Sequence, residues 1–278
     1  MPERQLVINC DDYGSCFSAN EGVQRALTQG VATSATLMVP CPWGYDGALR
    51  AKEHPEWAVG VHLTLTCEWA RYRWRPLLSR ERVPGLYDPA GFMWARTADV
   101  HSHATAEEAH AECVAQVEQA IGWGLRPSHL DSHMGASQTH PAFYEAYLAV
   151  AKRFGLPVRM AGPGDLAAAV ERGQAWAAQA RQAAADRGIR FTDDLVLGGR
   201  RPDEDARTHF LRVLRDLPPG SSEVLFHPAV ASDELRAMTG HAAERAADLH
   251  LLTEDAEVRR TIQEQGIRLI SYRDIAHA

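Results

Sequence analysis

The chain begins MPERQLVINCDDYG (residues 1–14), and this stretch decides how the fold is interpreted. After a short polar leader, Leu6 to Cys10 form an apolar run with the length and composition of a buried β-strand. Two carboxylates, Asp11 and Asp12, come directly after this run. In parallel α/β folds the functional groups lie at the carboxyl ends of the strands. The first strand therefore indicates both a fold class and a place for a site.

Similar strand-like runs recur along the chain and alternate with longer helical patterns. We expect strands at residues 6–10, 35–39, 58–65, 128–131, 158–160, 191–197, 223–226 and 268–270. We expect helices at 19–29, 44–53, 106–123, 141–154, 166–187, 204–214 and 255–265, followed by a terminal helical turn. This alternation predicts an α/β protein built as a single distorted parallel (β/α) barrel, similar to a TIM barrel. A doubly wound sheet is the alternative, although no glycine-rich nucleotide motif follows a strand.

No repeat or low-complexity linker divides the sequence, so we expect one domain over residues 1–278. The irregular part is an insertion at about residues 67–104, which is rich in tryptophan, tyrosine and arginine. A loop of this length inside a compact domain is usually a lid, a binding loop or an assembly element. We expect it to border the pocket, with Trp74 contacting a sugar ring or a dimer partner.

Composition excludes several classes of function. The 278 residues are 45% hydrophobic and 23% charged, with a formal net charge of -7 and a pI near 6.0. This charge and the lack of basic runs argue against nucleic acid as a partner. No signal-peptide pattern and no apolar run of about 20 residues is present, so we expect a cytoplasmic protein that does not span a membrane. The five scattered cysteines indicate reduced thiols.

Acidic and histidine side chains follow several of the expected strands: Asp11, Asp12, His62, Asp131, His133 and His227. In a parallel barrel all of these positions face the same end. One carboxylate and two imidazoles suffice to hold a divalent metal with room for water and substrate. Taken singly, each residue could instead be a turn, a helix cap or a hydrogen-bonded core histidine. Their shared placement at strand ends favours a metal site.

Two other functions are compatible with these residues. A metal-dependent phosphoesterase or another barrel amidohydrolase also uses paired aspartates and scattered histidines. A two-metal phosphoesterase usually has a denser ligand set, and amidohydrolases carry an H-x-H pair on the first strand, where this chain reads Asn9-Cys10-Asp11. A sugar-binding protein on an inactive enzyme fold is the non-enzymatic alternative.

Five segments, in order, carry a resemblance to a known family: VINCDDYG at 7–14, ATSATLM at 32–38, GVHLTL at 60–65, PSHLDSH at 127–133 and FHP at 226–228. They resemble the successive motifs of the YdjC/ChbG-like carbohydrate deacetylases, which are similar to the NodB-type polysaccharide deacetylases. The resemblance implies a distorted (β/α) barrel, commonly a homodimer. It also implies hydrolysis of the acetamido group of a small amino-sugar substrate.

The resemblance also implies residue roles: Asp12, His62 and His133 as metal ligands, Asp11 as general base, His227 as general acid, and Arg159 near the substrate. The implied cofactor is one divalent ion, Mg²⁺ or Zn²⁺, with Mn²⁺ and Co²⁺ as alternatives. One segment departs from the family. Many relatives continue with further alternating histidines where this chain reads HMGAS at 133–137, so contacts on that side of the pocket differ.

Overall fold

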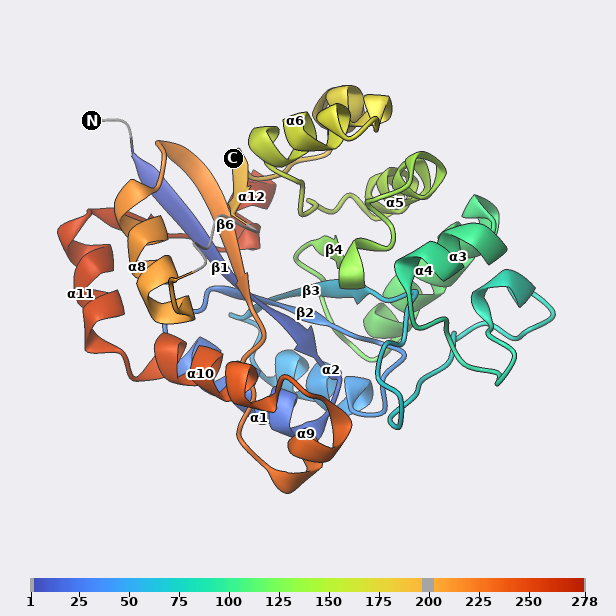
Figure 1. Cartoon of the computed structure of the whole chain (residues 1–278), viewed down its shortest axis with the longest axis horizontal. Helices are drawn as coiled ribbons and strands as arrows, with labels where there is room; N and C mark the ends of the chain where they lie inside the picture. Colours follow the sequence, from blue (N-terminus) through green and yellow to red (C-terminus); the bar gives the residue numbers. More distant parts are fainter. Residues whose placement is uncertain (1–2, 197–202, 278) are drawn as a thin grey trace.

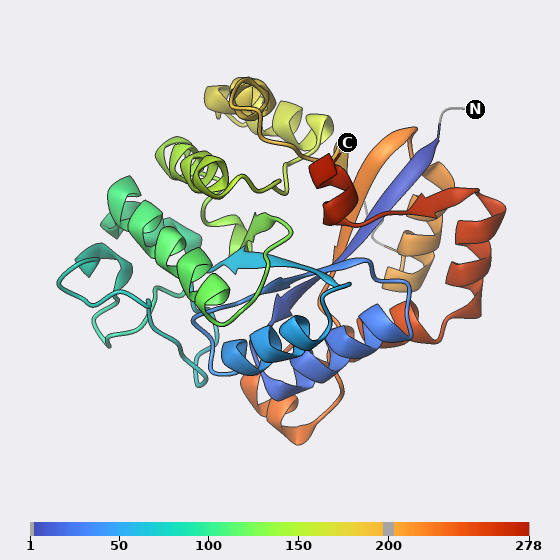
Figure 2. The same ribbon diagram turned by 180° about the vertical axis from the view of Figure 1, so that it is seen from behind.

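A computed structural model describes residues 3–196 and 203–277 (Figure 1). Its strands form one curled sheet in which every strand pair is parallel, with helices packed around the outside (Figure 2). The strands are β1 (Arg4–Tyr13), β2 (Ser34–Leu37), β3 (Ala58–Leu63), β4 (Leu130–Ser132), β5 (Asp194–Val196), β6 (Gly220–Phe226) and β7 (Ile267–Leu269). The expected distorted parallel α/β barrel is confirmed, as a sheet that curls without closing.

The order β4-β3-β2-β1-β6-β5 places β1 at the centre of the sheet. β1 pairs with β6 from Arg4 to Cys10, with β7 beside its first residues and β2 beside its last. Buried apolar side chains cover both faces of β1, as expected for a strand enclosed by helices. Its carboxyl end therefore reaches the middle of the rim where the ends of β2, β3, β4 and β6 also meet.

Helices connect the strands. The longer ones are α1 (Phe17–Thr28), α2 (Gly44–Glu53), α4 (Ala106–Gly122), α5 (Pro141–Phe154), α8 (Ala206–Asp216), α10 (Ala242–Thr253) and α11 (Ala256–Glu264). The shorter ones are α3 (Thr97–His103), α6 (Pro163–Glu171), α7 (Ala180–Asp186), α9 (Asp233–Met238) and α12 (Tyr272–His277), with 3₁₀ turns at Pro84–Leu86, His133–Gly135 and Ala175–Gln179. In the described part of the chain, none of these helices combines the length and apolarity that a membrane span requires.

Three expected elements differ from the structure. The helix expected over 166–187 is divided, because Gly173 adopts a left-handed conformation (φ 87°) that ends α6 and is followed by a 3₁₀ turn before α7. The strand expected at 158–160 is reduced to a single bridge between Val158 and Leu130. The strand expected at 191–197 is confined to β5, and Leu197 lies outside the described residues.

The insertion at 67–104 packs around a small core and has hydrogen bonds that attach it to the rest of the domain. Trp74 lies in a small core with Trp69 and Met93, and its indole N–H donates to the Thr66 carbonyl at 2.9 Å. The buried carboxylate of Glu112, from α4, accepts hydrogen bonds from the backbone N–H groups of residues 77 and 78. These contacts hold the insertion against the body of the domain beside α4 (Figure 1).

Candidate metal centre

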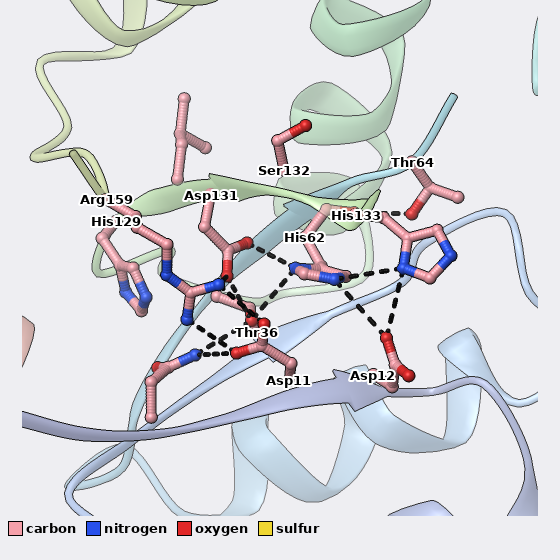
Figure 3. A network of polar contacts seen from close by, with 12 residues as sticks. Asp11, Asp12, Thr36, His62, Thr64, His129, Asp131, Ser132, His133 and Arg159 are labelled. Carbon is pink, nitrogen blue, oxygen red and sulfur yellow. Dashed lines mark hydrogen bonds and ion pairs between the residues drawn. The ribbon is translucent and has the colours of Figure 1, made fainter. Parts of the chain in front are cut away.

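The carboxyl end of β1 brings two adjacent carboxylates to one site. Successive side chains of a strand alternate between its faces, so Asp11 and Asp12 in a regular strand would point apart. Here the pairing of β1 with β2 shifts register between Cys10 and Tyr13, and Asp12 has a left-handed φ of 61°. Aspartate tolerates this conformation better than most residues. Both carboxylates consequently join one buried polar network (Figure 3).

Asp12, His62 and His133 converge as the motifs predicted, from the ends of β1, β3 and β4 (Figure 3). Asp12 Oδ1 lies 3.4 Å from His62 Nε2 and 3.3 Å from His133 Nδ1, and the two nitrogens are 3.3 Å apart. Two atoms bound about 2.05 Å from one ion at a tetrahedral angle are about 3.3 Å apart. The three atoms therefore have the spacing of ligands around one small cation.

The outer nitrogen of each histidine has a carboxylate partner. His62 Nδ1 lies 2.6 Å from Asp131 Oδ1, and His133 Nε2 lies 2.9 Å from Glu68 Oε2. A carboxylate on the outer nitrogen orients a metal-binding imidazole and holds the proton on that side. The lone pairs of His62 Nε2 and His133 Nδ1 are then directed at the centre of the triangle.

The centre favours positive charge. Asp12 Oδ1 is buried and has no hydrogen-bond partner among the described residues. Burial would lower the pKa of His62, but Asp131 and Asp12 raise that pKa to about 10. Burial would likewise lower the pKa of His133, while Glu68 and Asp12 raise it to about 9. A divalent cation can replace the two protons that these surroundings stabilise, so the donor set fits a metal ion.

Arg159 joins the site from the segment after α5, where Val158 makes a bridge with Leu130 of β4. It is 4% exposed, and its guanidinium donates to both oxygens of Asp11, at 2.6 and 2.7 Å. It also contacts Asp131 at 2.9 Å and Glu223 at 2.8 Å. Burial favours the protonated form of Asp11, but the opposing charge of Arg159 prevails and holds the pKa of that carboxyl below its usual value. Arg159 thus binds carboxylates of the site and keeps Asp11 ionised and oriented.

The triangle lies in the wall of a pocket of about 890 Å³ that also contains Asp11, Arg159 and His227. His227 follows β6, and its backbone N–H donates to Asp248 Oδ2 at 2.9 Å. The six residues to which the resemblance assigns a role therefore border one cavity. An activated water, a base and an acid could act there on one substrate.

Trp74 is placed differently from the sequence expectation. Its side chain is 3% exposed and packs edge-on against Trp69, with 5.6 Å between the ring centroids. Trp69 and Met134 line the pocket, and Trp74 is absent from the described lining. The aromatic-rich insertion therefore borders the pocket, but Trp69 lines it instead of Trp74.

Among the pocket residues that sequence reasoning did not single out, four contact or adjoin the candidate centre: Glu68, Trp69, Arg245 and Asp248. None follows a strand, since two belong to the insertion and two to α10. The only signal for Glu68 and Trp69 was their position at the start of the insertion. For Arg245 and Asp248 the sequence carries no motif. Arg245 contacts Asp12 of β1 and Asp248 contacts His227 after β6, and both contacts join parts of the chain that are distant in sequence.

Comparison with known proteins agrees with this architecture. The model of the YdjC-like protein family matches residues 5–264. A protein of Enterococcus faecalis named carbohydrate deacetylase is 30% identical, over 99% of this chain and 100% of its own length. A Geobacillus stearothermophilus protein of the same name is also 30% identical, over 98% of both chains.

Among solved structures, a protein from Enterococcus faecalis V583 superimposes with a TM-score of 0.83 at 28% identity, covering 98% of both chains. Its description proposes cellobiose-phosphate cleavage. The family match spans nearly the whole chain and includes every strand that contributes to the pocket. On these grounds the chain belongs to the YdjC-like family.

Proposed function

We propose that this protein is a metal-dependent hydrolase that removes an acetyl group from the amide nitrogen of an N-acetylated amino sugar or oligosaccharide. The observation that carries the proposal is the buried triangle of Asp12 Oδ1, His62 Nε2 and His133 Nδ1, whose sides are 3.3–3.4 Å long. Family membership and the name carbohydrate deacetylase of two relatives support the reaction class.

Asp12, His62 and His133 would hold one divalent ion. Two imidazoles and a carboxylate suit Zn²⁺, Co²⁺ or Mn²⁺ by ligand type, and Mg²⁺ is a further candidate. Such an ion, when bound, supplies Lewis-acid activation of water and of the acyl oxygen. Glu68 and Asp131 keep the two imidazole rings oriented with their free lone pairs toward the ion.

Asp11 would act as general base. Its carboxylate is ionised, since Arg159 holds its pKa low, and it lies one residue from a ligand on the same turn. Arg159 fixes both oxygens, so the carboxylate is oriented before substrate arrives. The same ion pair weakens Asp11 as a base, so it would take the proton only as the water attacks the carbonyl carbon.

His227 would act as general acid from the end of β6. Amine expulsion from a tetrahedral intermediate requires a proton on the nitrogen, which an imidazolium can donate. Asp248 fixes the His227 backbone, and its own carboxylate lines the same pocket. Asp11 would thus take a proton from the water that attacks the carbonyl carbon, and His227 would give a proton to the departing nitrogen.

The test is a screen of N-acetylated mono- and oligosaccharides for acetate release, with phosphate release from phosphorylated disaccharides measured in parallel. We expect acetate release that chelator abolishes and one divalent metal restores. Phosphate release without acetate release would favour the phosphoesterase alternative. Sugar binding without either product would favour a sugar-binding protein. The expected homodimer stays a prediction, which the molar mass in solution would check.

A further inference from the structure

Arg245 is a buried cation at the edge of the metal centre. It projects from α10, is 8% exposed, and its Nη2 lies 2.5 Å from Asp12 Oδ2. The other oxygen of the same carboxylate, Oδ1, faces His62 and His133. The two oxygens of Asp12 therefore have separate partners.

Neighbouring groups fix the position of Arg245 independently of Asp12. Its guanidinium carbon lies 5.5 Å from the centroid of the Trp69 ring, a cation–π contact with the insertion. Its backbone carbonyl accepts a hydrogen bond from the Ala229 N–H at 3.1 Å, two residues after His227. One residue thus connects β1, the loop after β6 and the insertion around the pocket.

An unrestrained carboxylate can bind a cation through one oxygen or through both, and it can rotate between these modes. An arginine that holds one oxygen removes this freedom, because its donors have a fixed planar geometry. We infer that Arg245 is a positioning residue of the metal centre, which retains Asp12 Oδ2 so that a cation meets only Oδ1. This inference rests on the proposed metal site.

Two effects of Arg245 on a cation oppose each other. Orientation of Asp12 strengthens binding, whereas the positive guanidinium repels a second positive charge. Asp12 itself compensates much of that repulsion, and Glu68 contributes further negative charge nearby. Orientation then dominates, and loss of Arg245 weakens metal binding by the roughly 10–100-fold typical of outer-shell partners.

The test measures metal affinity directly, by competition of the metal-free protein with a chromophoric chelator for Zn²⁺. Arg245→Met removes the charge and the hydrogen bond but keeps an unbranched apolar stem. Arg245→Lys keeps the charge and removes the planar fork. Arg236→Met, on neighbouring α9, is the matched control, because among the residues that the structure describes its ion pair is an exposed one with Asp233.

We expect Kd for Zn²⁺ to rise about 10–100-fold in Arg245→Met, by a smaller factor in Arg245→Lys, and not at all in Arg236→Met. With Co²⁺ bound, the visible absorption band should change in both Arg245 variants, because the ligand geometry changes. Wild-type or tighter affinity in Arg245→Met would overturn the inference and leave the proposed function intact. If wild-type protein binds no metal, the proposed function fails with it.

Folding of the metal-free variants is checked by circular dichroism. If Arg245→Met does not fold, the Kd of Arg245→Lys for Zn²⁺ alone tests the inference. An increase of Kd in that variant supports the positioning role, and an unchanged Kd overturns it.

Discussion

Replacing Asp11 by Asn separates proton transfer from metal binding. The amide is close to the carboxylate in size but cannot accept the proton of the attacking water, so kcat should fall by about 10²–10⁴. Because Asp11 is not a proposed ligand, one metal ion per chain should remain. This combination of full metal content and lost turnover is the expected result.

The structure also predicts a loss of stability in this variant. Asp11 receives two hydrogen bonds from the buried Arg159, at 2.6 and 2.7 Å, and an amide would direct an N–H group at one of these donors. Breaking a buried ion pair costs about 3–5 kcal/mol. Arg159 keeps its ion pairs with Asp131 and Glu223, so we expect the free energy of unfolding to fall by about 3 kcal/mol, at the lower end of this range. At about 2 °C per kcal/mol for a domain of this size, Tm should fall by about 6 °C.

Glu223→Gln is the matched control, since it disturbs the same guanidinium without altering Asp11. We expect it to lower Tm by a similar amount and to reduce kcat much less. Metal content by elemental analysis, acetate release and calorimetry are measured on both variants. Loss of metal from a folded Asp11→Asn protein would make Asp11 a ligand. Equal rate losses in the two variants would refute its role as base.

Four other outcomes follow from the site and its surroundings. His227→Ala should retain metal and lose rate on an amide more than on an activated ester, which needs no proton on its leaving group; equal losses would exclude a general acid. Asp131→Asn, which removes the carboxylate on His62 Nδ1, should weaken metal binding about 10–100-fold, as measured by chelator competition. Trp74→Ala should lower the free energy of unfolding by about 3–5 kcal/mol, because the ring is buried. Trp69→Ala, at the pocket wall, should raise KM more than Trp74→Ala does.

The sequence was sufficient for most of the central sheet and for bringing the candidate metal ligands to one end of it. Runs such as 6–10 and 58–65 are apolar on both faces, which is typical of strands covered by helices. Parallel strands direct their carboxyl ends to one rim, so the acidic and histidine residues at strand ends could be grouped without coordinates. The choice of Asp12, His62 and His133 among them came from the family resemblance. The left-handed turn at Asp12, which brings both aspartates into one network, was not evident from sequence.

Other features depend on contacts that no local pattern encodes. Glu68 and Arg245 reach the triad from the insertion and from α10, and their partners lie 65 and 233 residues away in sequence. The break at Gly173 in an alanine-rich stretch was missed because helix propensity dominated that window. Trp74 was preferred to Trp69 because composition identifies an aromatic segment but not which ring it exposes.

The central claim is that one metal ion is bound between Asp12, His62 and His133, and anomalous diffraction from a crystal grown with Zn²⁺ tests it most directly. We predict a single anomalous peak in the pocket, within about 2.0–2.3 Å of Asp12 Oδ1, His62 Nε2 and His133 Nδ1. No peak at this position in a crystal soaked with excess Zn²⁺, or a peak held by other side chains, would contradict the account.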